Sequence, residues 1–190
     1  MKTLFERARK QIDSAVLVTG NAHKVLEAER ICGFPVESAD IDLPEIQSRQ
    51  LSEVAEEKAR EALRRLRRPV IVEETGLELE AMNGFPGPLV KWMLGAIGPE
   101  GIANAALTLD DPKATAVCMV VLYDGQSFFE GLGRTEGALV LPGRGEHGFG
   151  WDPVFQPTGE LRTYGELGDE RKDEIGHRGR AWRELAGRLA

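Results

Sequence analysis

Residues 15–21 read Ala15-Val16-Leu17-Val18-Thr19-Gly20-Asn21, and this stretch indicates the fold of the chain. Its four apolar residues predict a short buried strand that ends at Thr19-Gly20. Asn21 is a typical N-cap, and apolar residues then repeat at helical spacing as far as Cys32. A buried strand that passes directly into a capped helix is typical of α/β proteins.

The alternation of strands and helices continues to the end of the chain. A second helix is expected after a cap at Ser52, with an inner apolar stripe and outward Glu56–Arg60 and Glu61–Arg65 pairs, and Pro69 ends it. Further expected elements are a buried strand at 70–72, an extended segment at 77–81, helices at 88–94 and 99–107, a hairpin of 114–123 with 127–140, and a closing helix around Trp182, Leu185 and Leu189. We therefore expect an α/β fold with a mixed central sheet flanked by helices.

The composition limits the class of protein. A chain of 190 residues with 42% hydrophobic residues can form one domain, or two small lobes, around a real core. The net charge of −7 argues against a nucleic-acid polymer or an anionic membrane as partner. No apolar run approaches the ~20 residues that a membrane span needs. Cys32 and Cys118 lack metal-type spacing, so we expect a reduced, cytoplasmic protein.

An anion site is expected where Thr19-Gly20-Asn21 leads into the helix that contains Lys24. A strand end followed by a helix N-terminus presents free backbone N–H groups and the positive end of the helix dipole. Thr19 and Asn21 add side-chain donors, and Lys24 adds a full charge. The spacing is not that of a P-loop, and a purely structural turn is the alternative for this segment alone. His23 is expected to face solvent without a role.

A metal site is expected at Glu73-Glu74, which follow the buried strand and precede Thr75-Gly76. Carboxylates exposed at a strand end beside a glycine turn suit Mg²⁺, which prefers oxygen ligands and usually keeps several waters. For this pair alone, the alternative is a set of surface ion pairs.

A planar ligand with polar edges is indicated by Gly148-Phe149-Gly150-Trp151-Asp152. Glycine lets the backbone approach a ligand closely, and an exposed Phe149 offers a flat face on which a nucleobase can stack. The alternative for this stretch alone is a glycine-rich turn whose aromatic side chains join the core.

Together the segments resemble the inosine/xanthosine triphosphate pyrophosphatases, which cut non-standard purine nucleoside triphosphates to the monophosphate and pyrophosphate. The resemblance runs in order from about Val16 to Trp182. Besides the stretches already quoted, it includes Ile41-Asp42-Leu43-Pro44-Glu45, Val72-Glu73-Glu74-Thr75-Gly76-Leu77, Asn83-Gly84-Phe85-Pro86-Gly87-Pro88, Lys91-Trp92 and His177-Arg178-Gly179. The Pro44-Glu45 and Lys91-Trp92 versions look closer to the inosine triphosphatase branch of eukaryotes and archaea.

The resemblance implies an elongated, two-lobed fold in which residues 1–190 form one domain with the site in the cleft between lobes. It also implies a homodimer, and Mg²⁺ (with Mn²⁺ as an acceptable substitute) held by Glu45 and Glu74. Glu74 and Lys24 are the implied catalytic residues. The implied substrate contacts are Thr19, Gly20, Asn21, Lys24, Lys58, Glu74, Thr75, Lys91, Phe149, Gly150, Trp151, Asp152, Lys172, His177 and Arg178.

The roles of these residues divide between the two ends of a nucleotide. Lys24, Lys58 and Lys172 are assigned to the phosphates, and Lys91 is assigned to a nucleotide contact. His177 and Arg178 are donors for the 6-oxo group of a purine, a position where adenine presents a donor of its own. Phe149 and Trp151 would stack on or wall the base, and Asp152 could accept from its N–H groups.

The chain departs from the family pattern at two positions. Glu74 stands where the family usually has Asp, which changes the reach of the carboxylate to metal and water by about an ångström. Gly176 stands where Ser is common, which removes a hydroxyl and is expected to loosen the turn before His177. Two alternatives therefore stay open: an enzyme of the same fold that acts on another nucleotide, and a nucleotide-binding module that has lost hydrolysis.

Overall fold

The computed structural model describes residues 2–190, with side chains from Leu4 onward. Helices and strands alternate along this range, as the sequence predicts. The helices are α1 (Lys2–Asp13), α2 (Ala22–Cys32), α3 (Leu51–Leu66), α4 (Val90–Thr108), α5 (Asp169–Ile175) and α6 (His177–Leu189), with short 3-10 helices at Glu80–Met82 and Asp152–Val154. The strands are β1 (Val16–Val18), β2 (Ser38–Ala39), β3 (Val70–Leu79), β4 (Pro86–Gly87), β5 (Lys113–Tyr123), β6 (Phe128–Leu139) and β7 (Phe155–Pro157).

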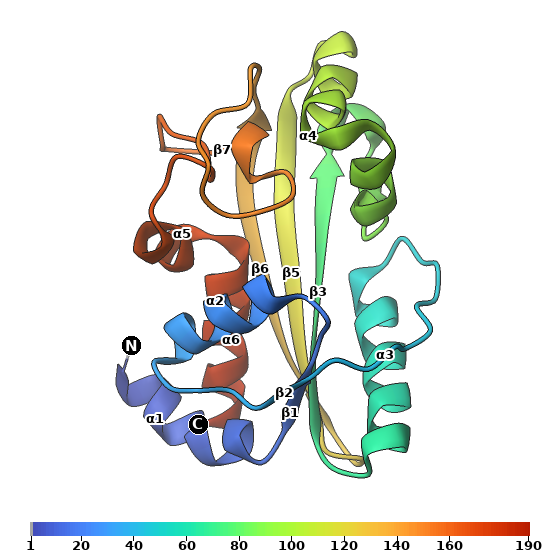
Figure 1. Ribbon diagram of the computed structural model, residues 1–190, viewed down its shortest axis with the longest axis vertical. Helices are drawn as coiled ribbons and strands as arrows, with labels where there is room; N and C mark the ends of the chain where they lie inside the picture. Colours follow the sequence, from blue (N-terminus) through green and yellow to red (C-terminus); the bar gives the residue numbers. More distant parts are fainter. Residues whose placement is uncertain (1) are drawn as a thin grey trace.

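One seven-stranded mixed sheet connects these elements, in the order β2-β1-β3-β5-β6-β7, with β4 paired to β3. The three long strands β3, β5 and β6 are antiparallel neighbours, and they run along the long axis of the molecule (Figure 1). The short strands β1 and β2 lie parallel to one another, and β1 lies parallel to the first residues of β3. The expected mixed α/β sheet and the expected hairpin of β5 with β6 are both confirmed.

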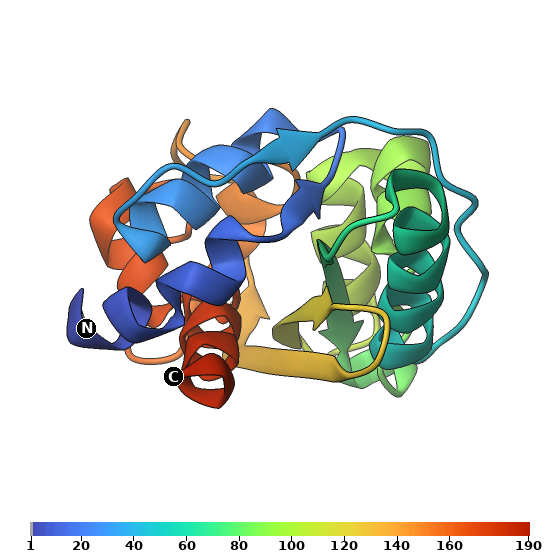
Figure 2. The same cartoon turned by 90° about the horizontal axis from the view of Figure 1, so that it is seen from below.

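Helices cover the sheet differently at its two ends. At the lower end in Figure 1, α1, α2 and α6 lie on one side and α3 lies on the other, and the view from below shows the same separation (Figure 2). At the upper end α4 lies to the right of the strands in this view, and β7 lies at the far edge of the sheet (Figure 1). The molecule is therefore elongated and two-lobed, as expected.

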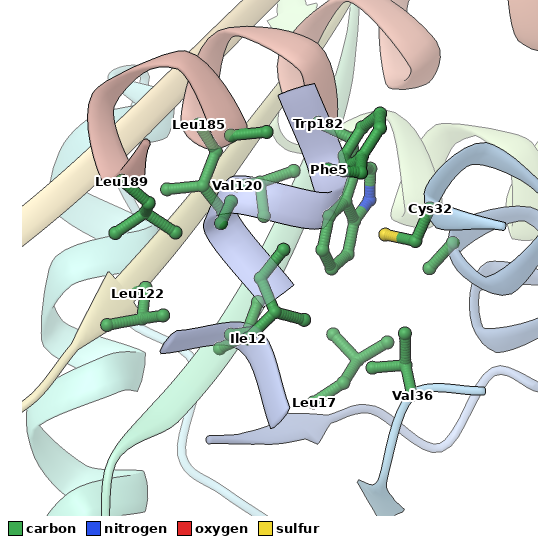
Figure 3. Packing of buried hydrophobic residues seen from close by; sticks show 14 of the residues in the cluster. Phe5, Ile12, Leu17, Cys32, Val36, Val120, Leu122, Trp182, Leu185 and Leu189 are labelled. Carbon is green, nitrogen blue, oxygen red and sulfur yellow. The ribbon is translucent and has the colours of Figure 1, made fainter. Parts of the chain in front are cut away.

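Each face of the sheet has its own apolar core. On the face covered by α1, α2 and α6, the closing helix α6 contributes Trp182, Leu185 and Leu189 to a cluster that also contains Phe5 and Ile12 (Figure 3). On the other face Ala55, Ala59 and Ala62 of α3 pack on β1 and β3. A third cluster lies between α4 and the upper ends of β3 and β5. The small residues on α3 let the helix lie close to the sheet. Within residues 2–190, no helix has both the length and the apolar character that crossing a membrane requires.

Two local expectations are wrong. Ser52 is not the cap of α3, because the helix begins one residue earlier and Gln50 occupies the N-cap position without a side-chain hydrogen bond. The Ser48 hydroxyl accepts a hydrogen bond from the Gln50 N–H at 3.0 Å, which holds the turn that precedes the helix. The segment 70–72 is not a short strand that ends before an exposed acidic pair, because β3 continues unbroken to Leu79.

The expected pair of helices between residues 88 and 107 corresponds to one element with a sharp kink. Within α4, Gly98 adopts φ 69° and ψ 175°, and Pro99 follows it. A positive φ of this kind favours glycine, and proline cannot supply the hydrogen bond that would continue the first helical segment. The kink separates a segment that borders the cleft described below from a segment that packs in the upper core.

Candidate active site

A cleft of about 600 Å³ lies between the lower and upper lobes. Its lower wall comes from the turn after β1, the segment 40–48, α3 and the middle of β3, and its upper wall comes from the start of α4 and the loop 149–151. Twelve of the residues predicted from the sequence line it, namely Thr19, Gly20, Asn21, Lys24, Glu45, Lys58, Glu74, Thr75, Lys91, Phe149, Gly150 and Trp151. The fold therefore brings together residues that are up to 132 positions apart in the chain.

The turn after β1 is held tightly against the next strand. The Thr19 N–H donates to the Ala39 carbonyl at 3.0 Å, and a Cβ on Gly20 would lie 2.8 Å from a carboxylate oxygen of Asp40. Asn21 caps α2 as predicted, with its side chain accepting from the His23 N–H at 3.0 Å. The turn therefore presents the N-terminus of α2 to the cleft, which is an arrangement that favours an anion.

The carboxylates of Glu45 and Glu74 converge on a single cation. The Lys58 ammonium lies 2.9 Å from Glu45 Oε1 and 2.6 Å from Glu74 Oε1. Burial lowers the pKa of Lys58, but Glu74 and Glu45 outweigh it, so the pKa is raised overall. For Glu45, burial raises the pKa and the hydrogen bond from Lys58 outweighs it, so the pKa is lowered overall. Both groups are therefore held in their charged forms.

These carboxylates fit a hard divalent cation that is completed by other ligands. Among the described residues, no group of three or more His, Cys, Asp or Glu side chains lies close enough to hold a metal alone. Mg²⁺, however, is usually held by one or two carboxylates together with waters and substrate phosphates. The Lys58 ammonium already occupies the space between the two carboxylates, which shows that this position stabilises positive charge.

The expected strand end at Glu73-Glu74 is replaced by the middle of β3. Glu74 lies opposite Met119 of β5, and Gly76 is not in a turn: a Cβ there would meet the Gly87 backbone of β4 at 2.9 Å. Hydrogen bonding to β5 keeps this acidic segment extended although glutamate and glycine are poor strand formers. Because β1 ends beside Val72, the turn after β1 still reaches Glu74.

Aromatic side chains and Lys91 form the upper wall of the cleft. Lys91 is 73% exposed, and its ammonium lies 3.7 Å from Glu45 Oε2. Trp92, which also lines the cleft, is 65% exposed. His23 is exposed as expected, but its ring stacks on the Phe149 ring with centroids 5.2 Å apart. A flat ligand in the cleft would therefore meet the Phe149 ring, on which the His23 ring is stacked.

Four predicted contact residues do not line the cleft. Asp152, Lys172, His177 and Arg178 are each at most 4% exposed. The Lys172 ammonium is bound by Glu27 at 2.9 Å and by Asp152 at 2.7 Å. Their predicted contacts with substrate stay predictions: in this structure buried carboxylates bind Lys172 and Arg178, and Lys172 binds Asp152.

Arg178 is the centre of this buried cluster. Its Nε lies 2.8 Å from Glu73 Oε1, and its Nη1 is bound by Glu27. Burial lowers the pKa of Arg178, but attraction to Glu73 and Glu27 raises it well above its ordinary value. For Glu27, burial raises the pKa and the combined effect of Arg178 and Lys172 lowers it to about 2. Arg178 and Glu27 are therefore both held in their charged forms.

Phe149 separates the buried charges from the cleft. The Lys172 ammonium lies 5.1 Å and the Arg178 guanidinium 5.4 Å from the centre of the Phe149 ring. Its backbone N–H donates to Asp152 at 2.7 Å, which ties the loop to the same cluster. Arg178, a predicted base contact, and Lys172 therefore lie behind the Phe149 ring, next to the cleft.

Three polar side-chain atoms are buried without a partner among the described residues, namely the indole Nε1 of Trp151, the Nδ1 of His177 and the hydroxyl of Tyr164. Burial, with the nearby charges of Arg178 and Lys172, lowers the pKa of His177 well below its ordinary value. A neutral imidazole has one donor and one acceptor nitrogen. Because an unpaired buried polar group costs free energy, these atoms favour a polar partner.

Gly176 does not loosen the turn before His177, contrary to expectation. Its N–H donates to the Lys172 carbonyl at 2.8 Å, and a Cβ would lie 2.5 Å from that same carbonyl oxygen. The absence of a side chain lets α5 and α6 join at close range, with Lys172 and His177 on either side. Gly176 therefore tightens the connection.

The Gly176→Ser substitution, which introduces the residue common in the family, is expected to destabilise this chain. The added Cβ collides with a backbone oxygen, and overpacking of this kind costs about 1–3 kcal/mol. Urea unfolding would measure the loss. Gly168→Ser is the matched control, since Gly168 is the N-cap of α5 and has no atom within 4 Å of a new Cβ. The control should gain a few tenths of a kcal/mol at most. Equal stability of the Gly176→Ser protein and the native chain would contradict the prediction.

Glu27 and Glu73 are the two site residues whose roles the sequence did not reveal. Their bonds to Lys172 and Arg178 span 145 and 105 residues, so no local pattern signals them. A glutamate is by default an exposed residue. The only sequence hint for Glu27 is its position three residues after Lys24, which places it on the neighbouring surface of α2.

Comparisons with known proteins agree with this geometry. Residues 15–188 match the Ham1 family. The chain is 40% identical over 173 residues to an inosine triphosphate pyrophosphatase from Schizosaccharomyces pombe, covering 88% of this chain and 90% of that protein. A HAM1 protein from Coxiella burnetii has a similar structure, with a TM-score of 0.77, 27% identity, and coverage of 90% of this chain and 95% of that one. A structure described as a nucleoside-triphosphatase or dITP/XTP pyrophosphatase from Mycobacterium abscessus gives a TM-score of 0.67 at 28% identity, covering 87% and 95%.

Proposed function

This chain belongs to the Ham1 family, and from that premise we propose that it hydrolyses non-standard purine nucleoside triphosphates such as ITP, dITP and XTP to the monophosphate and pyrophosphate. One observation carries the proposal. The same cleft has carboxylates and lysines at one end and an aromatic loop, backed by polar groups, at the other. That arrangement suits a ligand with a highly charged tail and a flat head.

In the proposed reaction a water molecule attacks the α-phosphorus. The bond from that phosphorus to the bridging oxygen breaks, and pyrophosphate leaves. Lys24 and Lys58 neutralise the phosphates as flexible point charges. Glu74 orients the water and accepts its proton, a role that requires a carboxylate within reach of the phosphate end of the cleft. Its position beside Lys58 and Glu45 supports this assignment.

We propose Mg²⁺ as the metal, with Mn²⁺ as a substitute, and Glu45 and Glu74 as the protein ligands. When bound, such an ion supplies positive charge that stabilises the phosphate oxygens. Lys58 lies between the two carboxylates in this structure, so with the ion held there its ammonium would serve as a phosphate contact. Chelation should therefore abolish turnover and leave the fold intact, because no buried side chain depends on the metal.

At the other end we propose that Phe149 stacks on the purine and that His177 and Arg178 select a 6-oxo group. Two of the three unpartnered buried atoms, Trp151 Nε1 and His177 Nδ1, support a polar ligand in this region. The ring of Phe149 stands between cleft and cluster, so it has to move aside before a base reaches Arg178. A base that lacks the 6-oxo acceptor would leave these donors unpaired, so the site would discriminate strongly against it.

The proposal predicts that ITP, dITP or XTP releases pyrophosphate and that ATP is turned over far less efficiently. A panel of these nucleotides with GTP, assayed separately for pyrophosphate and orthophosphate, would test it. Orthophosphate as the product, or equal turnover of ATP, would refute the assignment. Efficient turnover of some other nucleotide alone would instead favour an enzyme of the same fold with a different substrate.

We further propose that residues 1–190 act as one pyrophosphatase domain in a cytoplasmic homodimer with no membrane or nucleic-acid partner. The net charge of −7 supports the absence of a polyanionic partner. Family resemblance supports the dimer, and sedimentation of the purified chain would test it.

A further inference from the structure

Glu73 is a buried carboxylate that the proposed mechanism leaves unused. It follows Val72 and precedes Glu74 in β3, and successive residues of a strand point to opposite faces of the sheet. Glu74 meets Lys58 of α3, whereas the side-chain partners of Glu73 come from α2 and α6. Glu73 is 2% exposed, so it cannot join Glu74 in the cleft.

Both oxygens of Glu73 are engaged. Oε1 lies 2.8 Å from Arg178 Nε, and Oε2 accepts from the indole N–H of Trp182 at 3.1 Å. The Lys24 ammonium donates to the main-chain oxygen of Glu73 at 2.8 Å and lies 3.8 Å from Oε1. One residue therefore binds a lysine that lines the cleft and the arginine behind the aromatic loop.

From Arg178 the contacts continue to the loop itself. Arg178 binds Glu27, and Glu27 accepts from Lys172 at 2.9 Å. Lys172 also donates to Asp152 at 2.7 Å, and Asp152 accepts from the Phe149 N–H at 2.7 Å. Cations and carboxylates alternate along this whole path. Glu73 joins it to the phosphate end of the cleft.

We propose that Glu73 is a positioning residue for the reaction, one that holds Lys24 at the phosphate end and Arg178 behind the base loop in a single fixed arrangement. The inference rests on the proposed pyrophosphohydrolase function and assigns Glu73 no contact with substrate. When the charge of Glu73 is removed, Lys24 keeps its main-chain acceptor but loses the nearby carboxylate. Arg178 then keeps Glu27 as its remaining carboxylate partner. A displacement of about 1 Å in such groups costs on the order of 100-fold in rate.

Glu73→Gln tests the inference because glutamine keeps the size of the side chain and removes its charge. We expect kcat/KM for ITP to fall about 100-fold. If Glu73 acts through Lys24, the same substitution in a Lys24→Ala background should lower kcat/KM by less than about tenfold, since coupled residues are not additive. A merely structural role would give equal losses in both backgrounds. Equal losses would therefore overturn the inference.

Glu78→Gln is the matched control, because Glu78 lies on the same strand and pairs with Arg134 at the surface. It should change kcat/KM by no more than about twofold, since exposed ion pairs contribute little. If Glu73→Gln fails to fold, Glu73→Asp retains the charge and withdraws it by one methylene. That variant should fold and show a smaller loss with the same dependence on Lys24.

The outcomes separate this inference from the proposed function. A native chain that releases no pyrophosphate from ITP would overturn the proposed function, and with it the inference. A fully active native chain whose Glu73→Gln and Glu73→Asp variants keep native kcat/KM would overturn the inference alone. Loss of activity with retained folding and reduced loss in the Lys24→Ala background would support both.

Discussion

Glu74→Gln should lower ITP hydrolysis by on the order of 10³-fold or more. A neutral amide neither balances a divalent cation nor accepts a proton from water, and general-base catalysis alone contributes 10²–10⁴-fold. Glu74 is a cleft residue whose carboxylate pairs with Lys58, so the substitution leaves the buried cluster around Glu73 untouched. Nucleotide binding should survive in part, because Lys24, Lys91 and the Phe149 loop remain. Single-turnover hydrolysis and calorimetric binding, measured on the same preparation, would show the split.

Glu74→Asp is the control for this prediction, since it restores the residue that the family usually has. It should keep or raise activity, provided that the cleft tolerates the shorter side chain. An active Glu74→Gln protein would remove Glu74 from the mechanism. An inactive native chain rescued by Glu74→Asp would instead favour a nucleotide-binding module that has lost hydrolysis.

The sequence predicted the elements whose signals are local. Asn21 as a cap, the inner apolar stripe of α3 and the hairpin of 114–123 with 127–140 each depend on neighbouring residues, and each is confirmed. The extent of β3 could not be predicted in this way. Its acidic segment has low strand propensity, and it is kept extended by pairing with β5, which is more than 40 residues later.

The candidate site was predictable where residues face the cleft and not where they are buried behind it. Glu74 belongs to a motif that carries the family resemblance, the resemblance assigns Lys58 to the phosphates, and both residues line the cleft. Lys172 belongs to no exposed surface, because Glu27 and Asp152 enclose it. Whether a lysine faces the cleft or is buried depends on its carboxylate partners, and these come from distant parts of the chain. Spacing along the sequence does not contain that information.

The buried cluster leads to the second large effect, which is on stability. Arg178→Ala leaves the carboxylates of Glu73 and Glu27 buried without their guanidinium partner. Removing one partner of a buried ion pair typically costs about 3–5 kcal/mol. Arg134→Ala is the control, because its pair with Glu78 is half exposed and should cost at most about 1 kcal/mol. Chemical denaturation of the two variants would measure both values.

The pH dependence of this loss identifies its cause. In the native chain the pKa of Glu27 is lowered from an ordinary value of 4.5 to about 2, because Arg178 and Lys172 outweigh burial. A lowered pKa in the folded state stabilises the protein above pH 4.5, and that stabilisation is lost as the pH falls toward 2. The difference in unfolding free energy between the native chain and Arg178→Ala should therefore be full near pH 7 and should narrow between pH 4.5 and 2. A difference that stays constant over this range would show that Arg178 stabilises the fold by packing, and the buried charges would not be the cause.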